Sequence, residues 1–414
     1  MKGKKIVSTL LVLLLLASLP VSAHAAVWDI GKGDITISAG SGGQTVTQGG
    51  GAAVNDSAPV ITGSSTENTV TINAEKDQTA SVTLSGADID VSGKGKAAVS
   101  TTGEGNVSIE LDGENTLKSA TNHAGLEKNN GGSLTIADED KNGKLTAEGG
   151  IYGAGIGGGY EGEGSNIAIT GGEVEATGGI GGAGIGGGKN GAGSSIAITG
   201  GEVKATGGKY GAGVGGGLSG NGNHITITGG EVKATGGLNG AGIGGGLWGK
   251  GKDITISGDA QLKVQGGVGD YFDGPGAGIG DGGSRPKEST GGNPIPGTEV
   301  EPDTSGLTTN GSIEYYAPGA DMEKDKPEKT TVGTLPPQEK PVEPIEPAEP
   351  EQPEAERGMD APLYRVTDRD GRDIAYTAEQ KGGVLTVTAD EDLAILTGRL
   401  SGIRTLKAQG VEKI

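Results

Sequence analysis

The sequence predicts an all-β protein whose main part is a single-stranded parallel β-helix with three short strands in each rung. Four copies of a 29-residue unit begin at Asn166, Ser195, His224 and Asp253, and a partial copy precedes them at residues 150–159. Each copy holds three short stretches in which apolar and polar residues alternate, separated by glycines. Such alternation is typical of strands, and strands this short bury an apolar face only when the copies stack.

Stacking would superimpose equivalent apolar residues of successive copies and so build the core. Substitutions between copies keep these positions apolar, whereas the positions between them change freely, a constraint that a disordered glycine-rich array would not need. The expected ladders are Ile167, Ile196, Ile225 and Ile254; Ile169, Ile198, Ile227 and Ile256; Val174, Val203, Val232 and Leu262; Ala154, Ala183, Ala212, Ala241 and Ala277; and Ile156, Ile185, Val214, Ile243 and Ile279.

Composition limits both the core and the partners. With 87 glycines, one Phe and no Cys, the core is aliphatic and is stabilised by sheet ladders rather than by disulfides. The formal net charge of −20 disfavours nucleic acid and anionic lipid as partners, but it does not disfavour neutral polysaccharide.

The N-terminus predicts export from the cytoplasm. Residues 1–25 contain three lysines, an apolar run and the small-residue site Ala23-His24-Ala25, which together are typical of a secretory signal peptide. The run is short for a membrane span, and nothing else in the chain is apolar enough to span. We therefore expect a secreted protein that is extracellular or associated with the cell surface, without membrane insertion once the signal is removed.

The predicted solenoid covers residues 27–283, with the regular copies over 166–281. Looser alternation before these copies predicts irregular rungs. Val82, Val107 and Leu134 begin such stretches 25 and 27 residues apart, close to the later period.

Two further segments follow the solenoid. Residues 284–360 are rich in Pro, Glu and Lys, which predicts a disordered, extended linker. Residues 361–414 predict a small β-rich segment with a turn at Asp370-Gly371, and we expect it to be incomplete because a strand pattern is still running at Ile414. Either segment could contact surface proteins.

Three strings carry a resemblance to a known family. ITGGxVxATGG, GAGIGGG and NVSIELDGENTL, within residues 81–283, resemble secreted carbohydrate-binding domain proteins, mostly of anaerobic Gram-positive bacteria, which have glycine-rich parallel β-helix repeats. The resemblance implies the same fold and polysaccharide binding at the cell exterior.

Aromatic residues are the candidates for carbohydrate contact, because aromatic rings can stack on the C–H faces of sugars. Tyr152 and Tyr210 occupy the same repeat position two copies apart, which at the usual strand spacing places them about 10 Å apart, near the length of a disaccharide. The alternative is that these side chains only pack against corners of the solenoid. The candidate residues are Tyr152, Tyr160, Tyr210, Trp248, Tyr271 and Phe272.

One acidic loop suggests Ca²⁺, the only cofactor that the sequence indicates. Asp138, Asp140 and Asn142 place oxygen ligands at alternate positions before a glycine, as the start of a calcium loop does. The bidentate Glu expected at the twelfth position is absent, because Gly149 stands there. A simple solvated turn is the alternative.

No catalytic site is predicted, and we expect no enzyme. Polysaccharide lyases and hydrolases with this architecture need non-repeating carboxylates that converge on one face, whereas Glu173, Glu202 and Glu231 form a repeating surface ladder. The first functional hypothesis is therefore a non-catalytic polysaccharide-binding module. A structural or adhesive stalk that contacts proteins is the alternative, and a β-helix lyase or hydrolase is the second alternative.

Overall fold

The computed structural model describes residues 25–285 and 293–335, together with the backbone of five strands between residues 364 and 411. The chain divides into two compact units, residues 1–340 and 341–414, and each is described by itself. The predicted signal peptide, except for Ala25, and most of the Pro/Glu-rich part of the linker lie outside the described residues.

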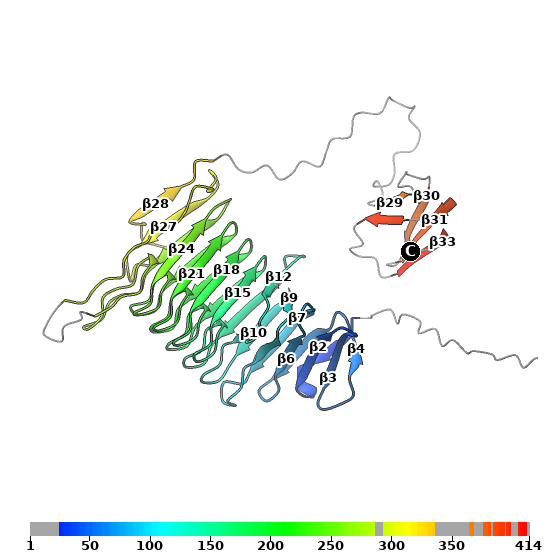
Figure 1. Cartoon of the computed structure of the whole chain (residues 1–414), viewed down its shortest axis with the longest axis horizontal. Coiled ribbons are helices and arrows are strands. Elements are labelled where there is room, and N and C mark those ends of the chain that lie inside the picture. The colour runs from blue at the N-terminus through cyan, green and yellow to red at the C-terminus, as the bar shows by residue number, and fades with distance from the viewer. Residues whose placement is uncertain are drawn as a thin grey trace, which may run out of the picture. The chain divides into compact units, whose positions relative to one another are not determined.

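The first unit is a parallel β-solenoid whose rungs stack side by side (Figure 1). Three parallel ladders run along it, and each rung contributes one strand to each ladder, which confirms the predicted fold class. The first ladder comprises β9 (Asn106–Asp112), β12 (Leu134–Ala137), β15 (Gly164–Ile169), β18 (Gly193–Ile198), β21 (Gly222–Ile227) and β24 (Gly251–Ile256). The second comprises β10 (Glu114–Lys118), β13 (Lys144–Glu148), β16 (Glu173–Thr177), β19 (Glu202–Thr206), β22 (Glu231–Thr235) and β25 (Gln261–Gln265).

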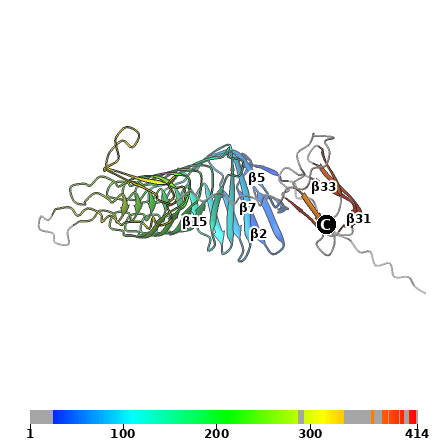
Figure 2. The same cartoon turned by 90° about the horizontal axis from the view of Figure 1, so that it is seen from above.

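The third ladder is made of shorter strands, most of them only two residues long. It comprises β6 (Val70–Ala74), β8 (Val99–Gly103), β11 (Leu126–Lys128), β14 (Ile156–Gly157), β17 (Ile185–Gly186), β20 (Val214–Gly215), β23 (Ile243–Gly244) and β26 (Ile279–Gly280). Seen from above, the solenoid narrows from the longer N-terminal strands toward the regular copies (Figure 2).

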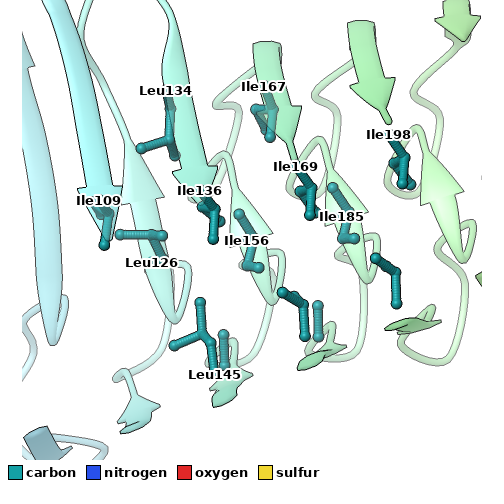
Figure 3. Packing of buried hydrophobic residues seen from close by; sticks show 14 of the residues in the cluster. Ile109, Leu126, Leu134, Ile136, Leu145, Ile156, Ile167, Ile169, Ile185 and Ile198 are labelled. Atoms are coloured by element: carbon teal, nitrogen blue, oxygen red, sulfur yellow. The ribbon is translucent and has the colours of Figure 1, made fainter. Parts of the chain in front are cut away.

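The core consists of the predicted ladders of like residues (Figure 3). Ile167 pairs in register with Ile196, and Ile156 pairs with Ile185, so equal spacing in the sequence becomes direct stacking in space. All residues of the five predicted ladders are buried, with exposed fractions between 0% and 3%. Continuous aliphatic stacking of this kind supplies the burial that no single rung could achieve.

The glycines of the regular copies are required by the close approach of neighbouring rungs. Gly186 has a φ of 132°, and a Cβ atom there would overlap the carbonyl oxygen of Gly215 in the next copy. A Cβ on Gly208 would likewise overlap the carbonyl oxygen of Gly179. The glycine-rich strings therefore form tight corners in which one backbone packs directly on the next.

The N-terminal rungs are less regular. β2 (Ile35–Gly40) pairs with β6 in parallel and with β3 (Gly43–Gln48) as an antiparallel hairpin, and β4 (Val54–Asn55) extends that hairpin. β1 (Val27–Asp29), followed by a 3-10 turn over Ile30–Lys32, pairs with β5 (Val60–Ser65), and β5 pairs with β7 (Thr79–Asp90). β7 is long enough to pair with both β9 and β10, so it joins the first two ladders.

The register of the irregular rungs is not visible in the apolar pattern alone. Val107 pairs with Leu134 in β12 and with Ala80 in β7, whereas Val82, two residues further along β7, pairs with Ile109. All of these residues point into the core, so a shift of two keeps the apolar pattern and the pattern alone does not reveal it.

The solenoid extends beyond residue 283 into the predicted linker. β27 (Ser312–Tyr316) pairs in parallel with β25, and β28 (Lys329–Val332) pairs with β27 in antiparallel orientation. Leu307 and Ile313 join the core. The Glu299 carboxylate accepts hydrogen bonds from the backbone amides of Gly278 (2.6 Å) and Ile279 (3.2 Å). Residues 293–335 thus cover the last rung as a cap.

The second unit contains two small sheets. β29 (Tyr364–Thr367) pairs with β32 (Ile395–Gly398), whereas β31 (Val384–Leu393) pairs with β30 (Tyr376–Lys381) and β33 (Thr405–Val411). The turn expected at Asp370-Gly371 lies outside the described residues. No helix among the described residues is long and apolar enough to cross a membrane.

Candidate functional site

Two tight turns flank each short strand of the third ladder. In the partial copy, the Gly153 amide donates to the Gly150 carbonyl and the Gly162 amide to the Gly159 carbonyl, and the same bonds recur in the following copies. The Ala154 amide donates to the Gly158 carbonyl, so the chain dips inward to bury Ile156 and the two turns lie on the outside.

The turns of successive copies join into one continuous edge. The second turn of each copy donates an amide to the first turn of the copy before it, as from Lys189 to the Tyr152 carbonyl (2.8 Å) and from Leu247 to the Tyr210 carbonyl (2.9 Å). We name this surface the aromatic edge. It consists of residues 150–153 and 159–162, the equivalent turns of the later copies, and the inserted residues 268–274 of the last copy.

All six predicted aromatic residues lie on the aromatic edge. Tyr152 and Tyr210 belong to first turns and are half-buried. The exposed fractions of the other side chains are high: Tyr160 43%, Trp248 48%, Tyr271 87% and Phe272 62%. Stacking of copies therefore gathers residues from distant parts of the sequence on one surface.

Tyr152 and Tyr160 form one group at the N-terminal end of this edge. Their ring centroids lie 5.7 Å apart, and the Lys189 ammonium of the next copy lies 4.4 Å from the Tyr152 centroid and 5.7 Å from that of Tyr160. The Glu161 carboxylate beside Tyr160 raises the pKa of its phenol by hydrogen bonding. Both rings therefore form a surface that combines apolar faces with charged groups.

A second group is built around the insertion in the last copy. The buried Asp273 carboxylate accepts a hydrogen bond from Trp248 Nε1 (2.9 Å) and a forked pair from Arg285 (Nε 3.2 Å, Nη2 2.9 Å). The Arg285 guanidinium lies 5.3 Å from the Trp248 centroid and 5.9 Å from that of Phe272. Tyr271 stacks edge-on against Phe272 at 5.0 Å. These contacts fix exposed rings in place.

Tyr210 lies between the two groups along the stack. The Lys209 ammonium lies 5.0 Å from its ring centroid. The repeat position just before Tyr152 holds an aliphatic residue in most copies, and Ile151, Ile180 and Val268 are 44%, 47% and 43% exposed. In the copy that contains Tyr210 the same position is Lys209. The edge therefore combines aromatic, aliphatic and charged side chains.

The predicted calcium residues also come together, in the turn that follows β12. Asp138 accepts hydrogen bonds from the amides of Asn142 (3.2 Å) and Gly143 (3.1 Å), and Asn142 Nδ2 donates to the Asp140 carboxylate (3.0 Å). Glu110, on β9 of the preceding rung, joins them. Ligand oxygens of Glu110, Asp138 and Asp140 all lie within 4.8 Å of one another.

Three clustered carboxylates fit a hard cation such as Ca²⁺ by ligand type. Partial burial raises the pKa of Glu110, and the negative charges of Glu139, Asp138 and Asp140 add to the shift. Against this, both Asp138 oxygens already accept backbone hydrogen bonds, which is how an acidic residue holds an ordinary turn. The geometry is thus compatible with either role.

Three grooves lie on other faces and lack the aromatic candidates. One of about 830 Å³ lies beside the acidic turn and is lined by Asp138 and Asn142. One of about 390 Å³ runs over the second ladder, where Lys233 and Lys263 pair with Glu323. Another of about 480 Å³ contains His224, Asp253 and Asp303. The hydrogen bonds from Ser305 lower the pKa of Asp303, opposite to what a general acid requires.

Several residues of the aromatic edge escape prediction from sequence. Lys189, Asp273 and Arg285 reach their aromatic partners only through stacking or through the fold of the insertion. Lys209 directly precedes Tyr210 in the sequence, but sequence alone does not show that its ammonium lies over the ring. The repeat alignment does carry a signal for Lys189, since it occupies the position of Tyr160 one copy later.

One protein-family model matches the chain. It is described as a Beta helix repeat and covers residues 141–160, 167–189, 196–218 and 225–247. These stretches include core ladders and most turns of the aromatic edge. No curated protein and no solved structure matches the chain.

Proposed function

We propose that this β-helix repeat protein binds polysaccharide without cleaving it, and that the aromatic edge is the binding surface. One observation carries the proposal: six aromatic residues from separate copies lie along a single edge of the solenoid, and four of them are more than 40% exposed. Exposed rings on rigid turns lose little conformational freedom when a flat ligand binds.

A surface of this shape suits a polymer better than a small molecule. The first and last aromatic groups are four rungs apart, which at the usual strand spacing is about 19 Å. The pyranose rings of successive sugars could stack on successive aromatic groups, while turn backbone and charged side chains meet the hydroxyls. We propose that this happens outside the cytoplasm, as the predicted signal peptide and the family resemblance imply.

The electrostatics of the described residues favour binding over catalysis. Glycoside cleavage by carboxyl groups needs one acid whose pKa is raised. Among the described residues the only carboxyl group with a raised pKa is that of Glu110, which lies on the first ladder rather than on the aromatic edge. We therefore place the enzymatic alternative last.

The adhesive-stalk alternative rests on a different observation. Ile151, Ile180 and Val268 are exposed aliphatic residues on the same edge, and they would also suit a protein partner. Binding of a sugar ligand should depend on the aromatic rings, whereas binding of a protein partner should depend on these aliphatic residues as well.

The test is retention of the chain, with residues 1–25 removed, on an array of plant and microbial polysaccharides. We expect retention that falls when Tyr210 and Trp248 are replaced by Ala, whereas Val54→Ala, at an exposed position far from the edge, leaves it unchanged. Absence of retention on every polysaccharide would contradict this proposal and favour the adhesive-stalk alternative.

A further inference from the structure

Every aromatic group on the edge has a cation over its ring. Lys189 covers Tyr152 and Tyr160, Lys209 covers Tyr210, and Arg285 covers Trp248 and Phe272, all with distances between 4.4 and 5.9 Å to the ring centroids. The arrangement recurs although Lys189 and Lys209 belong to turns of different copies and Arg285 follows the last copy. Cations and rings are thus combined along the whole edge.

Two of these cations have no carboxylate partner in the part of the chain that the structure describes. Among the described residues, no carboxylate oxygen lies within 4.0 Å of the Lys189 or Lys209 ammonium. Surface lysines of the second ladder differ, since Lys144 and Lys204 each pair with a glutamate. In a chain of net charge −20, these two lysines place positive charge beside aromatic rings, and no carboxylate of the described residues neutralises it.

Acidic side chains of the edge are mostly engaged elsewhere. The Asp270 carboxylate accepts hydrogen bonds from the amides of Phe272 (2.9 Å) and Asp273 (2.8 Å). Asp273 itself is buried beneath Arg285, whose side chain remains 56% exposed. Glu161 is the acidic group left in the first aromatic pair, and it lies beside Tyr160 rather than against Lys189.

We infer that the aromatic edge binds a glycan with anionic sugar units, bearing carboxylate or sulfate groups. The inference rests on the proposed function and specifies its ligand. An acidic sugar would place its C–H face on a tyrosine ring and its anionic group against Lys189 or Lys209. A neutral glycan could stack on the rings and accept hydrogen bonds from the ammonium groups, but it would gain no attraction between opposite charges. The acidic remainder of the chain repels such a polymer, which confines it to this edge.

Gly181 supports the placement of the lysine. It occupies the repeat position of Tyr152 in the next copy, and a Cβ there would lie 2.8 Å from the Lys189 Cβ. The absence of a side chain at this position therefore leaves the space through which the Lys189 stem reaches both tyrosine rings.

Affinity electrophoresis of the chain, with residues 1–25 removed, tests the inference with matched ligands. The probes are polygalacturonate, alginate and hyaluronan, each against its carboxyl-reduced form, and dextran sulfate against dextran. Carboxyl reduction keeps the linkage and removes the charge. We expect at least one acidic member to bind about tenfold more tightly than its neutral form, and the preference to weaken as salt rises. The first three pairs report carboxylate recognition and the fourth reports sulfate recognition.

Variants that remove one positive charge test whether Lys189 and Lys209 cause the preference for acidic glycan. Lys189→Met and Lys209→Met should each lower affinity for the acidic probe about fivefold and lower affinity for its neutral form much less. Lys76→Met removes one exposed charge far from the edge and should change neither. Equal binding of acidic and neutral forms, or an acidic preference that survives both edge variants, overturns the inference while leaving the proposed function intact. Binding to no probe and to no polysaccharide of the array removes both.

Discussion

The Lys189 ammonium lies 4.4 Å from the centroid of the Tyr152 ring, although the two residues belong to consecutive copies of the repeat. The contact exists because the second turn of one copy hydrogen-bonds to the first turn of the copy before it. A change in either turn should therefore alter the surface formed by both.

Gly181→Ala tests that dependence without replacing an aromatic or charged residue. The added methyl would meet the Lys189 Cβ at 2.8 Å and displace the side chain from the tyrosine rings. We expect weaker binding of acidic glycan, of the size caused by Lys189→Met, with a change in Tm of only a few degrees. Affinity electrophoresis and a thermal melt provide the two readings. Unchanged binding would show that the position of Lys189 does not matter.

Gly186→Ala should destabilise the solenoid strongly. Its φ of 132° disfavours any side chain, and the new Cβ would overlap the Gly215 carbonyl of the next copy. We expect a loss of more than about 2 kcal/mol in the free energy of unfolding. Gly93→Ala is the matched control, because a Cβ there meets nothing within 4 Å. Equal denaturation midpoints for the two variants would contradict the close-packed corner.

Glu110→Gln should stabilise the chain at neutral pH when a chelator is present. The pKa of Glu110 is raised in the folded state, because its charged form is disfavoured there. The free energy of unfolding of the wild type should therefore fall as pH rises from the ordinary glutamate pKa of about 4.3 through the folded pKa. The variant keeps an oxygen for the Glu139 amide. Thermal melts from pH 4 to 7 should show the advantage of the variant growing with pH. A constant difference would contradict the shift.

The same variant distinguishes a calcium site from an acidic turn. If Ca²⁺ binds Glu110, Asp138 and Asp140, added calcium should raise the Tm of the wild type and raise that of Glu110→Gln by less. Calcium without effect on the wild type would leave the cluster as a turn held by Asp138.

Lys128 should make stability rise with pH above neutrality. Its buried ammonium donates to the Asn130 carbonyl (2.8 Å), and burial lowers its pKa to about 8. The unfolded chain keeps the proton up to about pH 10.4, so between these values the unfolded state binds more protons and folding is increasingly favoured. The stability of the wild type relative to Lys128→Met should increase from pH 8 to 10. A difference independent of pH would exclude a shifted lysine.

The core of the solenoid could be predicted because the regular copies have equal length. Equal length forces Ile167 onto Ile196, and the same step repeats along the stack. In the irregular rungs that constraint is absent, so the sequence does not determine that Ala80, and not Val82, is the partner of Val107. The pairing of β27 with β25 could not be predicted either, because a single strand in a Pro- and Glu-rich stretch has no repeat to set its register.

The aromatic positions on the edge were partly predictable and their partners were not. Alignment of the copies places Tyr152 and Tyr210 at one position, but the reach of Lys189 across two turns depends on side-chain packing. Asp273 and Arg285 meet through an insertion that occurs in one copy only. Glu110 could have been found from the register, since it pairs with Ala137, next to Asp138.

The most direct test of polysaccharide binding at the aromatic edge uses Trp248, one of only two tryptophans in the chain. Trp28→Phe leaves Trp248 as the sole indole, 48% exposed and held by Asp273. Titration with the polysaccharide retained most strongly on the array should shift its fluorescence and protect it from iodide quenching, with the same midpoint as binding. Full retention with an unchanged, fully quenchable Trp248 would contradict binding at the insertion end of the edge.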